Sequence, residues 1–176
     1  MVIVGVSSDR GKWSNIMFRR LLDGPYDGEL IAVNPARNEI EGQPCYASLR
    51  DVPGEIDYVQ LLVAREHTVD AVQDCVARKV LVIHVLSSGF GEVSGEGPGF
   101  QSALVEALCG GASALIGPNS LGLYSAGHGL CFSDGCHFES GPVTFISQSG
   151  ALCTDVLAQG QTRGVKFSKV LSVEIG

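Results

Sequence analysis

Continuous apolar runs alternate with amphipathic segments along the first two thirds of the chain. The runs predicted as strands are 2–8, 29–35, 57–63, 80–90 and 114–122. Between them, apolar residues recur at helical spacing in the segments 14–22, 66–78 and 99–108. Continuous apolar runs are typical of strands that are buried on both faces of a parallel sheet. Repeated β-α-β units with short loops therefore predict an α/β protein with a doubly wound parallel sheet.

The pattern changes after Asn119. Residues 120–141 are rich in Gly, Ser, Cys and His and show little periodicity, so we interpret them as a connection between two domains. A new strand in GPVTFISQSG (141–150), with its apolar run at 143–146, a helix at 151–160 and a strand at 167–176 follow. One β-α-β unit cannot bury its own faces. The predicted domains are therefore 1–125, a linker at 126–141, and an incomplete second α/β domain at 142–176, whose remainder comes from elsewhere.

Composition excludes several classes of function. The chain has 176 residues, 45% hydrophobic and 18% charged, with a net charge of −7, which fits a globular protein and disfavours nucleic acid as a partner. No apolar stretch approaches the roughly 18 residues of a membrane span. Met1 leads directly into a strand without a basic leader, so we expect a cytoplasmic protein whose six cysteines are reduced thiols.

A zinc site is the first alternative to weigh, because His128, Cys131, Cys136 and His137 fall within a short segment. The Cys-x4-Cys spacing is looser than the usual zinc knuckle, and the segment is a glycine-rich loop. We therefore expect small buried thiols in a loop and assign no metal.

The loop after the first strand has the composition of an anion site. Gly5, Ser7, Ser8 and Gly11 allow backbone amides to approach a phosphate, and Lys12 adds a positive charge at the start of a helix. A plain strand-to-helix turn of small residues explains this loop equally well. The G-x-G-x-x-G fingerprint of nicotinamide-binding sheets is absent.

The end of the second strand discriminates between nucleotides. NAD-binding sheets place an acidic residue there, whereas this chain has Val33-Asn34-Pro35-Ala36-Arg37. Arg37 suits a ligand with an extra phosphate on its ribose, which both NADP and coenzyme A carry. After the fourth strand, the small residues of 87–92 (SSGFGE) again leave room for a ligand against the backbone.

A further junction of this kind lies at Ser147-Gln148-Ser149-Gly150, where an apolar strand gives way to a helix. Two hydroxyls and the exposed amides of a first helical turn make a candidate phosphate site. Taken alone, an ordinary N-cap by Ser149 is the simpler interpretation.

Six motifs in order carry a resemblance to a known family. They are VGVSSDRGKWSN, LIAVNPARNEIEGQPCYASLRDVP, DYVQLLV, SSGFGE, GPNSLG and FISQSGAL. The chain resembles, over nearly its whole length, the nucleoside-diphosphate-forming acyl-CoA synthetases, the family of the succinyl-CoA synthetase α subunit and the ADP-forming acetyl-CoA synthetases. The resemblance implies a Rossmann-like CoA-binding domain followed by the start of a flavodoxin-like domain.

The resemblance also implies two ligands, coenzyme A and phosphate. The residues predicted to bind coenzyme A are Ser7, Ser8, Gly11, Lys12, Asn34, Pro35, Arg37, Ser87, Ser88, Gly89, Phe90 and Asn119. The residues predicted to bind phosphate, or the phosphorylated histidine of the family, are Ser147, Gln148, Ser149 and Gly150. In the family's mechanism, acyl-CoA and phosphate give acyl phosphate and CoA, a histidine takes the phosphoryl group, and a swinging loop delivers it to ADP.

The chain departs from the family pattern in several places. None of His67, His84, His128 or His137 lies in the phosphohistidine motif, so we assign no catalytic residue. The expected partners are an ATP-grasp (β-type) subunit or domain and the remainder of the CoA-ligase domain. The family often has Cys at position 120, Lys at 36 and Pro at 64, where this chain has Ser120, Ala36 and Ala64.

Alternatives stay open at this point. One is an NAD(P)-binding oxidoreductase or sensor domain, and another is a non-catalytic CoA-binding regulatory module. The second phosphate junction argues against the bare module. The sequence leaves open the acid substrate, the choice of ADP or GDP, and the oligomeric state, although an incomplete sheet predicts association. We interpret the length of the chain as that of one subunit or a fragment of a longer synthetase, inactive alone.

Overall fold

The computed structural model describes residues 1–173 and contains a seven-stranded and a three-stranded sheet. The order of the larger sheet is β3-β4-β2-β1-β5-β6-β7. Its strands are β1 (Val2–Val4), β2 (Ile31–Val33), β3 (Glu39–Ile40), β4 (Gln43–Tyr46), β5 (Tyr58–Leu61), β6 (Val82–Val85) and β7 (Ala114–Ile116). All neighbours pair in parallel except β3 with β4. The predicted α/β fold with a doubly wound, mostly parallel sheet is confirmed.

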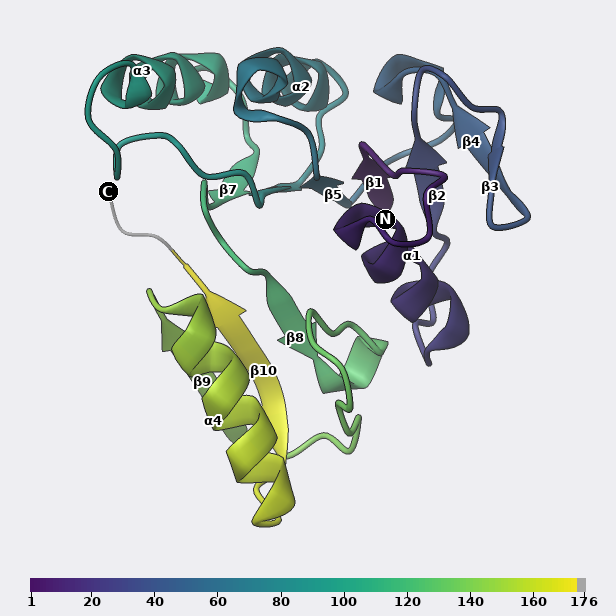
Figure 1. Ribbon diagram of the computed structural model, residues 1–176, viewed down its shortest axis with the longest axis vertical. Coiled ribbons are helices and arrows are strands. Elements are labelled where there is room, and N and C mark those ends of the chain that lie inside the picture. The colour runs from purple at the N-terminus through teal and green to yellow at the C-terminus, as the bar shows by residue number, and fades with distance from the viewer. Residues whose placement is uncertain (174–176) are drawn as a thin grey trace.

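Helices cover both faces of this sheet. The bounds are α1 (Trp13–Asp23), α2 (Arg65–Ala77) and α3 (Gly97–Leu108), each within three residues of the segment predicted from periodicity. Figure 1 shows α2 and α3 side by side on one side of the sheet, with α1 on the other. No helix in the described part of the chain is long and apolar enough to cross a bilayer.

Alternation along the strands divides the core between the two faces. Val59, Ile83 and Val85 belong to the cluster under α2 and α3, whereas Ile3 packs with α1. His84, between Ile83 and Val85, is fully buried and points to the face of Ile3, because neighbouring residues of a strand face opposite ways. A buried polar side chain on this face requires hydrogen-bond partners.

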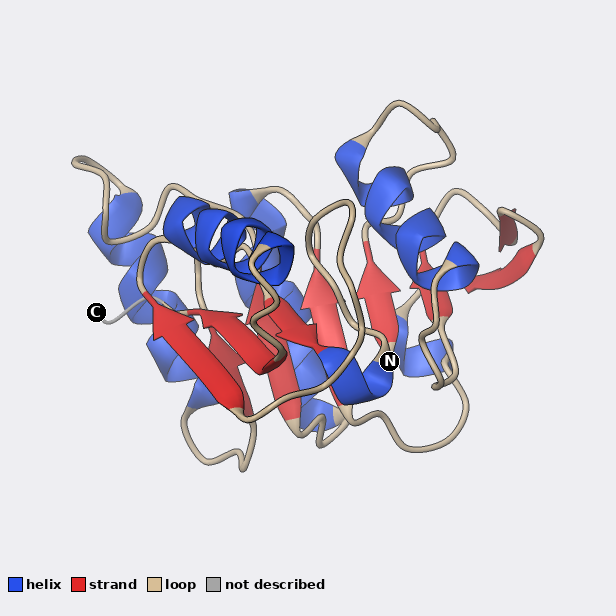
Figure 2. Cartoon of the chain, turned by 90° about the horizontal axis from the view of Figure 1, so that it is seen from below, coloured by secondary structure: helices blue, strands red, loops and turns tan. Residues whose placement is uncertain are grey.

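The smaller sheet has the order β8-β10-β9 and packs one helix. Its strands are β8 (Leu123–Ser125), β9 (Val143–Ser147) and β10 (Phe167–Ser172), and the helix is α4 (Gly150–Thr162). Strand β8 pairs antiparallel with β10, whereas β9 pairs in parallel with it. Figures 1 and 2 show this unit beside the larger sheet. Aromatic and aliphatic residues of β8, α4 and β10 form its core, together with Met17 of α1.

Three of the observed strands, β3, β4 and β8, were not predicted from the sequence. The prediction that residues 120–141 only connect two domains is wrong at the level of elements, because they contain β8 and a 3-10 helix, Ala126–His128. Strands β3 and β4 form a hairpin whose two turn residues, Glu41 and Gly42, both have positive φ. A second 3-10 helix spans Leu49–Asp51. Each missed strand has two to four residues, which is too short to show a pattern.

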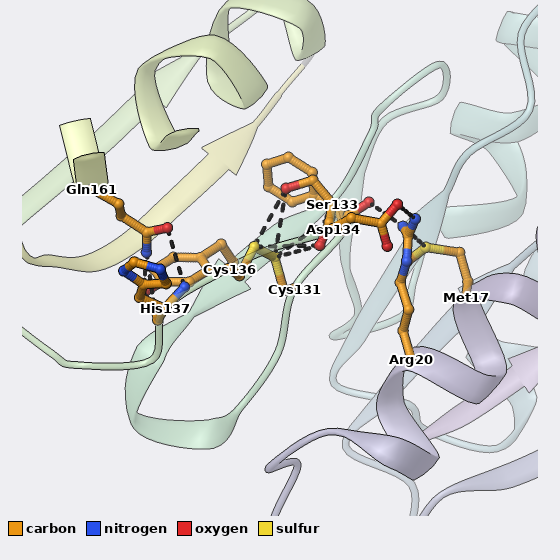
Figure 3. The surroundings of a disulfide bond; sticks show 10 residues. Met17, Arg20, Cys131, Ser133, Asp134, Cys136, His137 and Gln161 are labelled. Atoms are coloured by element: carbon orange, nitrogen blue, oxygen red, sulfur yellow. Dashed lines mark hydrogen bonds and ion pairs between the residues drawn. A yellow bond between two sulfur atoms is a disulfide. The ribbon is translucent and has the colours of Figure 1, made fainter. Parts of the chain in front are cut away.

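The expectation of six reduced thiols is also wrong, because Cys131 and Cys136 form a disulfide. Figure 3 shows this loop beside α1, where Arg20 pairs with Asp134 at 2.5 Å and donates to the carbonyl oxygen of Phe132 at 3.1 Å. The other four cysteines are free. The bridge closes a short loop that packs against α1, and it could not be predicted because both cysteines lie in an irregular segment.

Candidate functional site

The predicted ligand loops meet at the carboxyl edge of the larger sheet. The strand order reverses at β1, which lies between β2 and β5, so the loops that follow β1 and β5 leave the sheet toward opposite faces. Ligands of doubly wound sheets bind at such a reversal. The segments after the strands are 5–12 (after β1), 34–37 (after β2), 62–64 (after β5), 86–90 (after β6) and 117–119 (after β7).

Gly5 allows the loop after β1 and the loop after β5 to approach each other at the reversal. Its φ is +92°, and a Cβ atom there would lie 2.5 Å from the carbonyl oxygen of Leu62. A side chain is therefore excluded both by the left-handed backbone and by the contact. Its amide donates to the carbonyl oxygen of Val33 at 2.9 Å, which joins the ends of β1 and β2.

The loop after β1 is held by its own side chains. The amide of Ser7 donates to Ser14 Oγ at 3.1 Å, the amide of Asp9 to Ser7 Oγ at 3.0 Å, and the amide of Gly11 to Asp9 Oδ1 at 2.9 Å. These amides are satisfied internally and are not open to a ligand. The loop is thus preformed, and its capacity to attract an anion rests on Lys12 and on the dipole of α1.

The structure brings the second predicted segment against the first. Arg37 donates from Nε to Ser8 Oγ at 3.0 Å. Asn34 has a structural role, because its Nδ2 donates to the carbonyl oxygen of Val6 at 2.7 Å and its Oδ1 accepts from the amide of Ala36 at 2.8 Å. The exposed Lys12 makes no ion pair within residues 1–173. Two cations, Lys12 and Arg37, therefore flank this corner.

Two residues of this corner were not predicted. Asn15, fully buried in α1, donates to the carbonyl oxygen of Ser7 at 2.8 Å and to the Glu41 carboxylate at 3.1 Å. The bond from Asn15 and the Arg10 guanidinium at 2.9 Å lower the pKa of Glu41. A polar residue on the apolar face of a predicted helix was the available signal for Asn15. Glu41 had no local signal, because its partners lie 26 and 31 residues away.

The loop after β6 is closed around a carboxylate of its own. The two oxygens of Glu92 accept from the amide of Gly89 at 2.5 Å and from that of Phe90 at 2.9 Å. Burial raises the pKa of Glu92, but bonds such as that from the Gly89 amide outweigh it, so the net shift is downward. The Arg65 guanidinium donates to the carbonyl oxygen of Gly89 at 2.9 Å. Gly89 and Phe90 therefore present a surface whose amides are already satisfied, which suits a neutral ligand group better than a phosphate.

The turn after β7 joins the same edge. The amide of Asn119 donates to the carbonyl oxygen of Ser87 at 2.8 Å, and Ser87 Oγ in turn donates to the carbonyl oxygen of Val63. Gly117 has a φ of +97°, and a Cβ there would lie 2.4 Å from the carbonyl oxygen of Val85. The predicted residues Ser87 and Asn119 are thus in contact, at the ends of adjacent strands.

The junction before α4 combines a cap with open amides. Ser149 Oγ accepts from the amide of Leu152 at 3.2 Å, and Ser147 Oγ accepts from the amide of Ser149 at 3.1 Å. The simple N-cap is therefore present. No acceptor in residues 1–173 bonds the amides of Gly150 and Ala151, the first two of the helix. Those two amides are available to an anion while the cap is kept.

A doubly wound sheet whose carboxyl edge carries a preformed glycine loop, with Lys12 and Arg37 beside it, defines a nucleotide-binding α/β domain. The chain belongs to the CoA binding domain family, whose match covers residues 1–126. The family resemblance of the sequence motifs is confirmed.

Similar proteins extend beyond this domain. The acetate–CoA ligase [ADP-forming] I of Archaeoglobus fulgidus is 34% identical over 175 residues, which are 98% of this chain and 25% of that protein. The acetate–CoA ligase [ADP-forming] II subunit alpha of Pyrococcus furiosus is 29% identical over 98% of this chain and 38% of the subunit. The chain thus spans a quarter to about two fifths of these relatives.

A solved structure shares the fold over both sheets. The dinucleotide forming acetyl-coenzyme A synthetase 1 of Ca. Korarchaeum cryptofilum, in complex with phosphate and ADP, superposes with a TM-score of 0.86 at 29% identity. The match covers 98% of this chain and 37% of that one.

Proposed function

We propose that this chain is the coenzyme A-binding portion of an NDP-forming acid–CoA ligase, which joins a carboxylic acid to coenzyme A through an acyl phosphate. The observation that carries the proposal is the corner formed by Lys12 and by the Arg37–Ser8 contact at 3.0 Å. It offers positive charge for the ribose phosphate of coenzyme A, and no carboxylate follows β2 directly, where an NAD-binding sheet would have one.

The residues along the edge match the successive parts of coenzyme A. In this proposal, Lys12 and Arg37 bind the phosphates, and they are held in place by the loop of Ser7, Ser8 and Gly11 and by the segment of Asn34 and Pro35. Ser87, Ser88, Gly89 and Phe90 line the neutral pantetheine arm, which their internally satisfied amides favour. Asn119 lies where the thiol end arrives. Coenzyme A supplies the thiol that carries the acyl group, and the role of these residues is to bind and orient it.

The junction before α4 is the proposed phosphate station. Ser147, Gln148, Ser149 and Gly150 surround the two open amides at the positive end of a 13-residue helix. A phosphate or a phosphorylated side chain would accept from these amides without displacing the Ser149 cap. The relative with the same fold was solved with phosphate and ADP, which supports a phosphate ligand in proteins of this kind.

The complete reaction requires parts that residues 1–173 do not provide. We assign no catalytic residue: His84 is buried and hydrogen-bonded, and His128 lies at the surface 3.6 Å from Asp27. The proposed partners are an ATP-grasp domain or subunit and the rest of the ligase domain. One relative is named as an alpha subunit, which supports a separate partner chain. A cytoplasmic location is part of this proposal.

The test is isothermal titration calorimetry of the purified chain with coenzyme A, dephospho-CoA and NADH. We expect coenzyme A to bind, dephospho-CoA to bind more weakly because it lacks the ribose phosphate, and NADH not to bind. Lys12→Ala should weaken the binding of coenzyme A by about tenfold, because one charge-assisted hydrogen bond to a phosphate is lost.

Lys169→Ala is the matched control, because it removes an exposed lysine from β10 in the smaller sheet. It should leave the affinity unchanged. Binding of NADH without binding of coenzyme A would refute the proposal. Equal losses in the Lys12 and Lys169 variants would show that only the net charge matters.

A further inference from the structure

A chain of hydrogen bonds runs from the larger sheet to the smaller one. Tyr58 Oη lies 2.9 Å from His84 Nδ1, and His84 Nε2 lies 3.0 Å from the carbonyl oxygen of Ser120. Ser120 Oγ donates to the carbonyl oxygen of Ser172, on β10, at 2.6 Å. His84, Ser120 and Ser172 are each at most 1% exposed. Ser120 belongs to the segment between β7 and β8, whose course Figure 1 shows.

The direction of each bond in this chain is fixed. A carbonyl oxygen only accepts, so Nε2 of His84 carries the proton that is donated to Ser120. Burial lowers the pKa of His84 to about 4, which keeps the ring neutral at pH 7. Its Nδ1 is then an acceptor and takes the proton of the Tyr58 hydroxyl. The hydrogen bonds that link Tyr58, His84, Ser120 and Ser172 therefore have one arrangement of protons, in which each of the donors has an acceptor.

Ser120 is held by the larger sheet and itself holds the smaller one. Its amide donates to the carbonyl oxygen of Val85 at 3.3 Å, and its carbonyl accepts from His84. Its neighbour Asn119 contacts Ser87 in the proposed coenzyme A edge. The two bonds to the larger sheet fix the backbone of Ser120, so the direction of its hydroxyl toward Ser172 follows from the position of that edge.

The last residue of this hydrogen-bond series, Ser172, lies beside the proposed phosphate station. Ser172 pairs in register with Ser147, and its amide donates to the carbonyl oxygen of Gly122 at 3.0 Å. A Cβ on Gly150 would lie 2.9 Å from Leu121 Cβ and 3.5 Å from Ser172 Oγ. The start of α4 therefore rests directly on the residues that follow Ser120. A movement of Ser120 would be transmitted to it, because close-packed contacts leave no slack.

We propose that Ser120, oriented by His84, is a positioning residue that couples coenzyme A binding at the edge of the larger sheet to phosphate binding at the start of α4. This inference rests on the proposed function. A ligand that orders the contact between Ser87 and Asn119 also orders Ser120, and through Ser172 it orders the amides of Gly150 and Ala151. The second ligand then loses less conformational entropy on binding, so the two bind with positive cooperativity.

The test is the affinity of the chain for coenzyme A with and without saturating inorganic phosphate. In the wild type, phosphate should tighten coenzyme A binding by at least about fivefold. Ser120→Ala should reduce this factor to about one, while the affinity without phosphate stays within about threefold, since only one neutral hydrogen bond is lost.

The matched control is Ser113→Ala. Ser113 Oγ donates to the carbonyl oxygen of Val80 at 2.6 Å, so the same type of bond is removed at the opposite edge of the sheet. This variant should keep the wild-type cooperativity. A second pair of variants tests His84. His84→Gln retains an N–H donor for Ser120 and should keep the cooperativity, whereas His84→Leu should lose it.

Each outcome decides the matter. A phosphate effect that is the same in the wild type and in Ser120→Ala, simple competition included, would overturn the inference while leaving coenzyme A binding in place. Loss of cooperativity in Ser113→Ala as well would assign the effect to stability and would also overturn it. If the wild type binds no coenzyme A, the proposed function fails and this inference fails with it. If Ser120→Ala does not fold, the two His84 variants give the answer.

Discussion

Arg37 and Ser8, 29 positions apart in the sequence, are joined by a hydrogen bond of 3.0 Å from the guanidinium Nε to the hydroxyl oxygen. The bond ties the end of β2 to the loop after β1. Because Nε is occupied, the guanidinium is held in one orientation, and its two terminal nitrogens point their donors elsewhere. A ligand phosphate at this corner would meet a fixed donor pair.

Removing the Arg37 guanidinium should change the preference for coenzyme A over dephospho-CoA. It should change the affinity for dephospho-CoA itself much less. Arg37→Ala should lower the preference for coenzyme A over dephospho-CoA by about tenfold, because only coenzyme A carries the ribose phosphate. Parallel calorimetric titrations with both ligands measure this ratio. Arg163→Ala, at the exposed end of α4, should leave it unchanged. An unaltered ratio in Arg37→Ala would place the ribose phosphate elsewhere.

Replacing Ser149 should change the free energy of unfolding and the affinity for phosphate. It should not change the affinity for coenzyme A in the absence of phosphate. Ser149→Ala removes the acceptor for the amide of Leu152 and should lower the free energy of unfolding by about 1 kcal/mol. It should also weaken phosphate binding, while coenzyme A affinity without phosphate stays as in the wild type. Urea unfolding and calorimetry measure the two effects.

Ser149→Asn supplies the control, because Asn is a good N-cap and should restore most of the stability. If Ser149→Asn is as unstable as Ser149→Ala, the hydroxyl acts in some way other than as a cap. Loss of coenzyme A binding in either variant would contradict two separate stations.

His84 should make the fold sensitive to acid. Burial lowers its pKa from 6.5 to about 4 in the folded state, so between these values the unfolded chain binds the proton and the folded chain does not. The contribution of His84 to the free energy of unfolding is therefore fully present above pH 6.5. It falls by about 3 kcal/mol in total as the pH drops toward 4. The urea midpoint measured across this range gives the change.

His84→Gln is the control for this pH dependence, because Gln does not titrate. The difference between the wild-type and His84→Gln curves should be flat above pH 6.5 and should shrink or reverse below it. Parallel curves over the whole range would mean that His84 is protonated in the folded protein or exposed to water.

Gly5 should tolerate no side chain. Gly5→Ala adds a Cβ that would lie 2.5 Å from the carbonyl oxygen of Leu62, at a φ of +92°. Gly110→Ala, at a φ of +83° with nothing within 4 Å, adds the backbone strain alone. We expect Gly110→Ala to cost about 1 kcal/mol and Gly5→Ala to cost at least about 3 kcal/mol, measured by urea unfolding. Equal losses would mean that the close approach of these two loops relaxes freely.

Much of the larger sheet could be predicted from the sequence, because each central strand is a continuous apolar run and each helix has a clear apolar face. Strands β3, β4 and β8 could not. Gln43–Tyr46 contains a proline, and Leu123–Ser125 lies among glycines and serines, so neither shows a periodic pattern. Strand β8 is defined mainly by its pairing with β10, whose paired residues lie 44 to 48 positions later, so no local signal indicates it.

The candidate site, too, could be predicted from the sequence only in part. The loops at the strand ends could be located, since their glycines and hydroxyl residues directly follow apolar runs. Glu41 and Arg65 could not, because they contact residues 24 to 31 positions away. The closure of the 87–90 loop by Glu92 could not be predicted either, because the sequence does not show that this carboxylate turns back onto the amides of Gly89 and Phe90.

The antiparallel pairing of β8 with β10 has a practical consequence for protein engineering. The family match ends at residue 126, just after β8, so a recombinant module cut at that point would carry the strand away from its partner. The donated half would display an unpaired backbone ladder, and the half left behind would be reduced to two strands. Chimeras of this protein should therefore be joined before Leu123, so that β8 travels with the sheet to which it is hydrogen-bonded.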